Sequence, residues 1–230
     1  MVVAGFETMV DHKRAHAARA FRPFLLAYLT SLVASAKVTP LQRWNLTYSP
    51  GLNAPGTTRE VRVPSTVYGG LVAAGAFETP FYGRNLELVN ASEFDAPVVF
   101  SATLAQSMFA DVRVAVLELD GINYRARVDV DGVALQAGHA GGTNTTLLVG
   151  TYRSFRLPIP RHIWDGKSSV TLRVVVERPV DMWKPGSNST DLAISFIDWN
   201  PEAPDSSMGI WRPARLVTYP YETGMQGVMS

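Results

Sequence analysis

Apolar residues recur at every second position through much of the sequence after Pro97, which is the period of a β-strand with one buried face. This alternation covers 112–119 and 124–130, and Asp131-Gly132, directly after the second run, is the strongest short signal for a tight hairpin. Further strands are expected at 170–176, 192–196 and 211–219. Short strands at this spacing, with few helices, predict an all-β fold, an antiparallel β-sandwich or jelly roll.

The valine and proline positions predict how two of these segments lie in a sheet. In the first strand, 112–119, Val112, Val114 and Val116 alternate with Arg113 and Ala115, and Leu117 and Leu119 continue the run, as expected of a half-buried strand. Pro158 and Pro160 have no backbone N–H to donate, so their segment should lie at a sheet edge or in a turn. The polar insert 138–146 has no apolar pattern and is expected to be a surface loop.

The segment 44–77 predicts two extended stretches and one short helix. The stretches are expected within 44–64, on either side of a turn rich in proline and glycine at 50–56. The helix is expected over 65–77, with Ser65 as its N-cap and an apolar stripe along one face. A single short helix in a strand-rich chain is expected to close one end of the sandwich.

The N-terminal segment has the order of a secretory signal, with a basic region, an apolar run and a small-residue ending. The apolar run covers 24–33, leads into Ala34-Ser35-Ala36, and is shorter than the roughly 20 apolar residues that cross a bilayer. Because the basic region is long, an uncleaved signal anchor stays open beside a cleaved signal peptide. The predicted organisation is a signal at 1–36, one jelly-roll domain at 37–222 and a C-terminal tail at 223–230.

Four Asn-X-Ser/Thr sequons follow the signal, at Asn45, Asn90, Asn144 and Asn188. They predict N-glycosylation on surface loops, and so a protein of the secretory pathway that is secreted or lysosomal. The sequence has no cysteine, which excludes disulfides, thiol nucleophiles and thiolate metal sites. Its net charge of +1 gives no electrostatic reason to expect a nucleic-acid partner.

Residues 198–213 crowd carboxylates, indole rings, an amide and a guanidinium into a stretch whose prolines and glycine prevent a continuous helix or strand. This composition suits sugar binding, because an aromatic ring packs on the C–H face of a pyranose while charged and amide groups bind its hydroxyls. The same residues also occur in loops that pack as a lid over a core. The residues alone leave both interpretations open.

Four segments resemble, in the same order, motifs of the sugar-binding, galactose-binding-domain-like jelly roll that opens enzymes of glycoside hydrolase family 2. The similarity is to the branch of exo-β-glucosaminidases and β-mannosidases, and it extends over about 44–219. The matching segments are 63–67 with the preceding Trp44, 81–85, 121–126 and 198–212. Two departures are the prolines at 158 and 160, where the family usually carries an aspartate, and the length of the insert 138–146.

The resemblance implies a division of labour between this domain and a catalytic one. In the family, two carboxyl groups on a separate α/β barrel hydrolyse terminal β-mannosyl or β-glucosaminyl units, and this chain has no residues left for that barrel. It is therefore expected to be inactive alone, a fragment with no catalytic residue, metal or cofactor. The resemblance implies that Asp198 accepts hydrogen bonds from the terminal β-linked sugar, Trp199 forms part of the wall and Asn200 assists. Trp211 and Arg212 are expected to anchor the loop.

The sequence also offers other functions for these residues. Asp198 and Asp205 could act as a catalytic pair, but two carboxylates on a loop lack the rigid surroundings that such geometry needs. A cluster near the hairpin, formed by Asp120, Asp129 and Asp131, could hold calcium, although exposed turn carboxylates explain it more simply. The domain could also be a stand-alone carbohydrate-binding module, or a protein-interaction domain that presents an apolar face without catalysis.

Overall fold

The computed structural model describes residues 36–49, 56–138, 145–179 and 202–220, and these residues form a β-sandwich. The four-stranded sheet has the order β1-β13-β6-β10. Its strands are β1 (Lys37–Pro40), β13 (Ala214–Tyr219), β6 (Val114–Leu119) and β10 (Phe155–Ile159). Every strand pair in this sheet is antiparallel, which confirms the predicted fold class.

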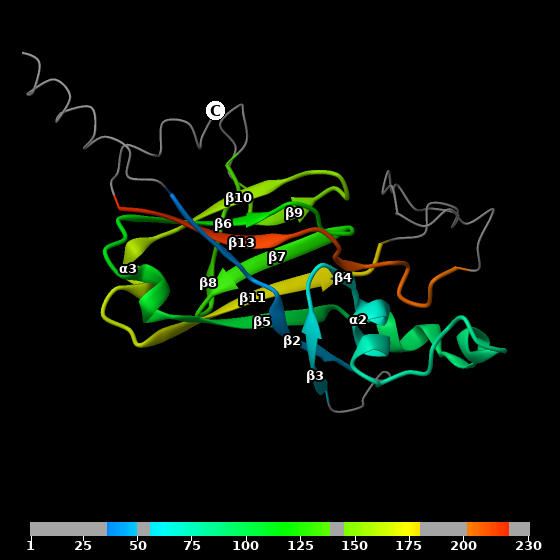
Figure 1. The fold of residues 1–230 in the computed structure, drawn as a ribbon. Helices are drawn as coiled ribbons and strands as arrows, with labels where there is room; N and C mark the ends of the chain where they lie inside the picture. Colours follow the sequence, from blue (N-terminus) through cyan, green and yellow to red (C-terminus); the bar gives the residue numbers. More distant parts are fainter. Residues whose placement is uncertain (1–35, 50–55, 139–144, 180–201, 221–230) are drawn as a thin grey trace, which may run out of the picture. The chain divides into compact units, whose positions relative to one another are not determined.

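The second sheet has seven strands in the order β3-β2-β5-β11-β7-β8, and β9 also pairs with β7. The strands are β3 (Thr57–Arg62), β2 (Arg43–Tyr48), β5 (Val98–Ala105), β11 (Ser169–Glu177), β7 (Arg125–Val130), β8 (Val133–Ala134) and β9 (Leu147–Val149). Figure 1 shows the two sheets as layers, with β10, β6 and β13 over β7, β11 and β5. A small third sheet pairs β4 (Ser65–Thr66) with β12 (Gly209–Ile210).

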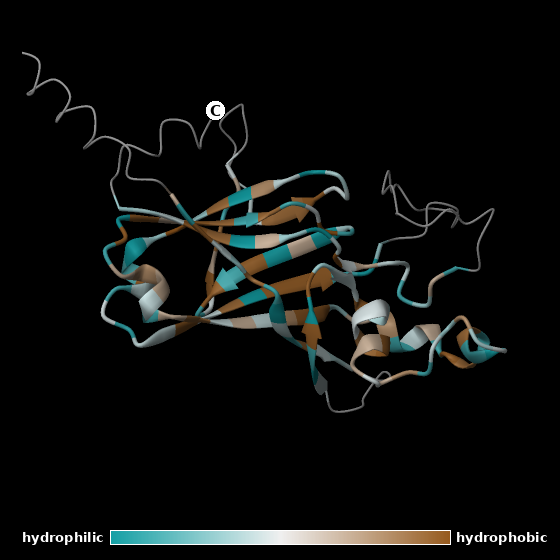
Figure 2. Cartoon of the chain, in the orientation of Figure 1, coloured by the Kyte–Doolittle hydropathy of each residue, from teal (hydrophilic) through white to brown (hydrophobic). Residues whose placement is uncertain are grey.

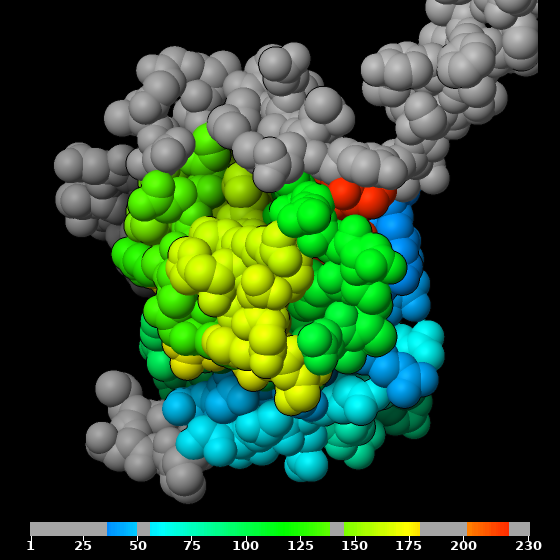
Figure 3. Space-filling view, turned by 90° about the vertical axis from the view of Figure 1, so that its left-hand side faces the viewer, coloured from blue at the N-terminus to red at the C-terminus, as the bar shows by residue number. Residues whose placement is uncertain are grey.

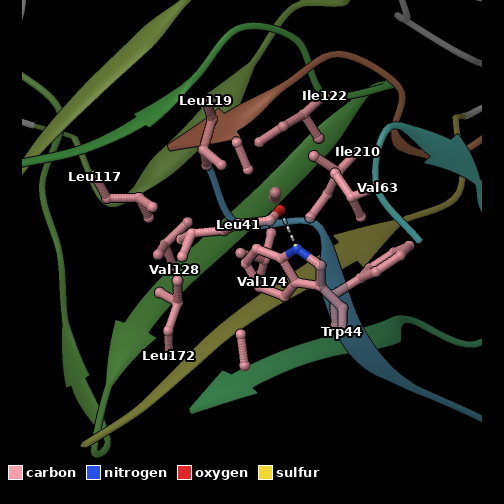
Figure 4. Close-up of a cluster of buried hydrophobic side chains, with 14 of the residues drawn as sticks. Leu41, Trp44, Val63, Leu117, Leu119, Ile122, Val128, Leu172, Val174 and Ile210 are labelled. Atoms are coloured by element: carbon pink, nitrogen blue, oxygen red, sulfur yellow. Dashed lines mark hydrogen bonds between the residues drawn. The ribbon is translucent and has the colours of Figure 1, made fainter. Parts of the chain in front are cut away.

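The core lies between the sheets and is built from alternate residues of the strands. In β11 the even positions from Val170 to Val176 are buried, while Thr171 and Arg173 are exposed. Figure 2 shows the corresponding alternation of hydrophobic and hydrophilic residues along the strands. Trp44 is 1% exposed at the centre of the cluster in Figure 4, and its indole Nε1 donates a 2.8 Å hydrogen bond to the carbonyl oxygen of Leu41.

Short helices with aromatic side chains close both ends of the sandwich. At one end, α2 (Val67–Ala73) carries Tyr68, whose ring meets Phe77 and Phe94 edge-on at centroid distances of 5.5 and 6.2 Å. At the other end, α3 (Arg161–Trp164) carries Trp164, whose ring stacks on Phe109 at 4.8 Å. Figure 3 views the α3 end in the space-filling representation. None of the described helices is long and apolar enough to span a membrane.

Several local predictions are confirmed. Asp131 and Gly132, with φ angles of 49° and 82°, form the two-residue turn between β7 and β8. The strand with Pro158, β10, pairs only with β6 and lies at a sheet edge. The extended stretches β2 and β3 flank the predicted turn, although 50–55 of that turn, 139–144 of the polar insert and the strand expected at 192–196 lie outside the described residues.

The predicted cap of the helix was wrong, and the structure adds two details. The helix α2 is capped by Thr66, whose Oγ1 accepts a 3.1 Å hydrogen bond from the backbone N–H of Gly69, because Ser65 is drawn into the bridge of β4 with β12. In β6 the core face carries Ala115, Leu117 and Leu119, and Val116 lies on the other face. The face with Val116 also carries Val114 and Glu118, and because apolar residues occur on both faces, alternation alone does not assign the core side. The edge strand β1 was not predicted from the sequence.

Replacing Trp44 with phenylalanine should lower the free energy of unfolding by roughly 2–4 kcal/mol, because the change leaves a cavity and an unpaired Leu41 carbonyl. Urea denaturation measures the effect. Val133→Ala, at a side chain that is 43% exposed, is the control and should cost under about 0.5 kcal/mol. Equal losses in the two variants would contradict the central role of Trp44.

Candidate functional site

The residues predicted to contact sugar, Asp198, Trp199 and Asn200, lie outside the described residues, and so do Asn144 and Asn188. The structure describes both ends of the segment that carries the three predicted contacts. One end is Arg178, immediately after β11, and the other is the stretch 202–213, which leads into β13. The geometry of these two ends, named here the loop base, shows how the segment is attached to the sandwich.

Arg178 joins the two ends of the loop base directly. Its Nε donates a 3.0 Å hydrogen bond to Oγ of Ser206, so the residue before the segment binds a residue after it. The same guanidinium forms an ion pair with Asp95 and donates to the carbonyl oxygen of Ala91 through Nη1. Because the Arg178 side chain is only 24% exposed, these bonds are partly shielded from water.

Asp205 attaches the loop base to helix α2. It is fully buried, its Oδ2 accepts a 2.7 Å hydrogen bond from the backbone N–H of Tyr68, and its Oδ1 accepts one of 2.9 Å from Ser207 N–H. The Tyr68 N–H lies in the first turn of α2, where no helical carbonyl is available to accept it. Asp205 and Thr66 thus share the capping of this helix, and a carboxylate with no exposed surface cannot contact a sugar.

Burial raises the pKa of Asp205 from its ordinary value to about 6. Loss of hydration is the dominant cause, and it outweighs the hydrogen bonds from backbone N–H groups and the positive charge of Arg178, which lower the pKa. The folded protein therefore favours the protonated form of this carboxyl more than the unfolded chain does. The resulting pH dependence concerns the stability of the loop base.

Asn123 is a buried amide that connects three loops. Its Nδ2 donates to the carbonyl oxygen of Ser207 at 2.8 Å, and its Oδ1 accepts a 2.9 Å hydrogen bond from Oγ1 of Thr151. Its backbone exchanges two hydrogen bonds with Gly209, of 2.9 and 2.8 Å. Asn123 is 0% exposed, so its amide has to find its donor and acceptor partners inside the protein, as it does here.

The backbone of the loop base adopts conformations that few residues tolerate. Ser206 and Ser207 have φ angles of 49° and 57°, in the left-handed region. Gly209 has a φ of 149°, and a Cβ added there would lie 2.6 Å from the carbonyl oxygen of Ser65. Glycine is therefore required at 209 so that the chain can pass against β4. Met208 beside it is fully buried in the core.

Trp211 and Arg212 hold the start of β13, in agreement with the anchoring role expected for them. The Trp211 indole Nε1 donates a 3.0 Å hydrogen bond to the carbonyl oxygen of Thr151, and the Arg212 guanidinium lies 5.0 Å from the indole ring centroid. The ring of Tyr152, which is 61% exposed, meets Trp211 edge-on at 5.5 Å. Gly121 allows this approach, because a Cβ there would lie 2.8 Å from Cδ of Arg212.

The three carboxylates that the sequence offered as a calcium site are each paired with a cation. Asp129 binds Arg173, Asp131 binds Lys167 at 2.7 Å, and Asp120 binds Arg215 at 2.7 Å. Within the described part of the chain, no group of three or more His, Cys, Asp or Glu residues is arranged to hold a metal ion. These carboxylates contribute to surface ion pairs, whose individual effect on stability is small.

Two of the predicted glycosylation sites are described, and both are exposed. Asn90 precedes a 3-10 turn, and its Oδ1 accepts a 3.1 Å hydrogen bond from the Ser92 N–H. Asn45 lies within β2, between Glu60 of β3 and Ser101 of β5. The expectation of a surface loop was therefore wrong for Asn45, because a sequon marks a surface position without specifying its secondary structure.

The sequence interpretation did not identify Asn123 and Arg178, whose side chains form hydrogen bonds that hold the loop base in place. Asn123 falls in the segment 121–126, whose resemblance to a family motif was noted without assigning a role to the amide. No local pattern distinguishes Arg178 from the other arginines. Its partners, Asp95 and Ser206, are far away in the sequence, and only the fold brings them together.

The pKa of Asp205 predicts how stability changes with pH. The protonated carboxyl is favoured in the folded state. Its contribution to the free energy of unfolding is therefore fully present below the unfolded pKa of about 3.9 and is lost as pH rises through the folded pKa of about 6. Asp205→Asn has a lower stability because one backbone N–H loses its acceptor. The difference in the free energy of unfolding between wild type and Asp205→Asn should narrow by about 2–3 kcal/mol between about pH 4 and pH 7.

Urea unfolding of both proteins across this pH range measures that gap. Asp165→Asn, which removes a carboxylate that is 56% exposed at the α3 end, is the control for the loss of charge alone. A constant difference between wild type and Asp205→Asn at every pH would show that burial of Asp205 does not shift its titration.

Removing the Asn123 amide should destabilise the domain more than removing an exposed amide does. Asn123→Ala removes the buried hydrogen bonds that the amide forms with Thr151 Oγ1 and with the Ser207 carbonyl oxygen, which should lower the free energy of unfolding by about 2–3 kcal/mol. The matched control is Asn85→Ala, which loses one exposed bond to the Thr79 carbonyl oxygen. Similar losses in the two variants, measured by urea denaturation, would contradict the role assigned to Asn123.

The chain is similar in sequence to parts of two longer proteins. The exo-β-D-glucosaminidase of Amycolatopsis orientalis is 29% identical over 152 residues, which are 64% of this chain and 13% of that protein. The exo-β-D-glucosaminidase of Streptomyces avermitilis is 26% identical over 165 residues, covering 71% of this chain and 16% of that protein. The chain thus spans less than a fifth of the length of these relatives.

Solved structures show the same fold. The crystal structure of the Amycolatopsis orientalis exo-chitosanase CsxA matches with a TM-score of 0.59 and 22% identity, over 79% of this chain and 20% of that one. The β-D-mannosidase from Dictyoglomus thermophilum matches with a TM-score of 0.56 and 15% identity, over 80% of this chain and 23% of that one. Residues 44–212 match the family described as "Glycosyl hydrolase 2 galactose-binding domain-like", and this chain belongs to that family.

Proposed function

We propose that this chain is the sugar-contacting domain of a family 2 β-glycosidase of the exo-β-glucosaminidase or β-mannosidase type. In this proposal Asp198 accepts hydrogen bonds from the hydroxyls of a terminal β-linked sugar, Trp199 forms part of the wall around it and Asn200 assists. A catalytic α/β barrel outside this sequence supplies both carboxyl groups of the reaction. Family membership and the glucosaminidase relatives support the proposal.

The observation that carries the proposal is the closure of the loop base. Arg178 binds Ser206 across the two ends of the segment, while Asp205 and Asn123 bind its second end to α2 and to the sheets. A contact residue on a long loop is useful for recognition only when the loop leaves a rigid frame. The buried polar bonds of the loop base are such a frame for the segment with Asp198.

The burial of Asp205 supports the assignment of catalysis to another domain. A retaining glycosidase needs two carboxyl groups about 5–5.5 Å apart that both reach the glycosidic bond. Asp205 is 0% exposed and both of its oxygens are bound to backbone N–H groups. The pairing of Asp198 with Asp205, considered from the sequence, therefore lacks one accessible partner.

The proposed setting is the secretory pathway, with glycans on exposed asparagines. Cleavage after Ala36 would release a chain whose first strand, β1, begins at Lys37, so the cut leaves the sandwich intact. Both Asn45 and Asn90 are exposed and available to the glycosylation machinery. We extend the same assignment to Asn144 and Asn188, and to a secreted or lysosomal location.

Sugar titration of the purified chain tests the proposal. Glucosamine and mannose β-glycosides should bind weakly, since half a site buries little of its ligand, and Asp198→Ala should weaken that binding roughly tenfold or more. Asp165→Ala, at an exposed position in the turn after α3, should bind as wild type does. The readout is the change of backbone amide NMR signals with ligand concentration.

A chromogenic β-glucosaminide and a β-mannoside, incubated with the same samples, complete the test. No hydrolysis is expected from the chain alone. Turnover that disappears in Asp198→Ala or Asp205→Ala would overturn the proposal, because the chain would then be a glycosidase without the barrel. Sugar affinity that is unchanged in Asp198→Ala would overturn the role of this residue.

A further inference from the structure

A tyrosine ring projects into solvent directly beside the loop base. Tyr152 is 61% exposed, whereas Thr151 before it is 2% exposed and donates a hydrogen bond to the buried Asn123 amide. Single exposed tyrosines are ordinary on protein surfaces. The surroundings of the Tyr152 ring therefore decide whether it has a role in binding.

The indole of Trp211 holds the Tyr152 ring at a fixed angle. The two rings meet edge-on at 86°, with their centroids 5.5 Å apart. The indole is itself fixed, because its Nε1 donates a 3.0 Å hydrogen bond to the Thr151 carbonyl oxygen. An edge-on neighbour covers at most one face of a ring, so at least one face of Tyr152 is left open on the Trp211 side of the contact.

A guanidinium lies against the same indole. Arg212 is exposed, and its guanidinium carbon lies 5.0 Å from the centroid of the Trp211 ring. No ion pair of this guanidinium occurs within the part of the chain that the structure describes, so its N–H donors are available to a ligand. Stacking on an aromatic ring orients a guanidinium without using these donors.

The backbone around the three side chains is shaped for their close approach. A Cβ at Gly121 would lie 2.8 Å from Cδ of Arg212 and 2.9 Å from Nε1 of Trp211, so only glycine leaves room for both. The backbone N–H of Gly150 donates a 3.1 Å hydrogen bond to the Tyr124 carbonyl oxygen, which fixes the start of the turn with Tyr152. In Figure 1 the end of β9 and the starts of β7 and β13 lie together at this end of the sandwich.

An open aromatic face beside a guanidinium suits a sugar ring. The C–H face of a pyranose packs on the aromatic ring, and its hydroxyls accept hydrogen bonds from the guanidinium. The positive charge disfavours a sugar that carries an ammonium group, so a neutral sugar fits better. Position also favours a sugar ligand, because Thr151 binds both Trp211 and the Asn123 amide that holds the loop base.

We propose that Tyr152, Trp211 and Arg212 form a second sugar-binding site, named here the Tyr152 platform, which holds a neutral sugar unit of a glycan. This inference rests on the proposed function, because it takes a glycan as the ligand. Tyr152 stacks on the sugar, Trp211 holds the Tyr152 ring in place and Arg212 donates hydrogen bonds to the hydroxyls. Because the platform lies on the surface and encloses little of its ligand, it binds weakly and adds to the contact with the terminal sugar.

NMR titration of the full chain with two trisaccharides tests the platform. The probes are a β-linked mannotriose, which is neutral, and a β-linked glucosamine trimer, whose amines are cationic at acidic pH. The indole Nε1–H signal of Trp211 and the backbone amides of 152–154 should shift with mannotriose concentration and give its Kd. Low ionic strength is used, so that salt does not screen the effect of charge on affinity.

Variants of Tyr152 separate the ring face from the hydroxyl. Tyr152→Ala should weaken mannotriose binding at this site about fivefold to tenfold, because the stacking surface is lost. Tyr152→Phe keeps that surface and should bind within about twofold of wild type. The matched control is Tyr82→Ala, which removes a tyrosine that is 76% exposed between α2 and β5 and should leave Kd unchanged.

The charge of Arg212 predicts a preference between the two probes. Mannotriose should bind about threefold to fivefold more tightly than the glucosamine trimer, since like charges a few ångströms apart in water repel by an energy of this size. Arg212→Gln should reduce that ratio toward one. Thermal melting checks that each variant is folded, and Tyr152→Leu, which keeps an apolar side chain without a flat ring, replaces Tyr152→Ala if the latter is unfolded.

Three results would each overturn the platform. These are a Trp211 indole signal that does not move in the wild-type titration, a mannotriose Kd that is the same in wild type and Tyr152→Ala, and tighter binding of the glucosamine trimer than of mannotriose. Asp198→Ala separates this inference from the proposed function, because it should leave the mannotriose-induced shift of Trp211 unchanged. A normal Trp211 shift with no effect of Asp198→Ala elsewhere would contradict only the role of Asp198.

Discussion

The buried amide of Asn123 connects the parts of the structure on which the proposed site depends. Its side chain binds Thr151 and Ser207, and its backbone binds Gly209, so three loops from different regions of the sequence meet at one residue. A buried donor or acceptor without a partner costs about as much as several surface contacts provide. The loops therefore depend on the same buried hydrogen bonds for their arrangement, and these bonds attach the loop base to the rest of the domain.

Asp205 shows how a carboxylate in a stretch that was predicted to bind sugar can have a structural role. Its two oxygens accept backbone N–H groups, one from the first turn of α2 and one from Ser207, and it has no accessible surface. Its burial raises its pKa to about 6, a direction also found in general acids of glycosidases. Here the shifted pKa follows from the capping position, because the carboxyl is out of contact with any ligand. A perturbed pKa identifies a functional group only when geometry gives it access.

Two structural features lie at the same end of the sandwich. The loop base offers rigid attachment for the segment that carries Asp198 and Trp199, and the segment between α2 and β5 holds Phe81, Tyr82 and Leu88 outside the core. Arg178 forms bonds to both.

The sequence by itself determined the fold class, because residues alternating in polarity require a half-buried sheet and Asp131-Gly132 specifies a hairpin turn. The motifs around Trp44 and the stretch 198–212 also indicated the family. Tertiary structure decided which face of β6 joins the core cluster, since apolar residues occur on both faces and only the packing of one sheet against the other distinguishes them. It also decided the roles of Asn123, Arg178 and Asp205. The partners that their side chains bind lie 28 or more positions away along the chain, except for the bond of Asp205 with Ser207, and such contacts leave no local pattern in a sequence.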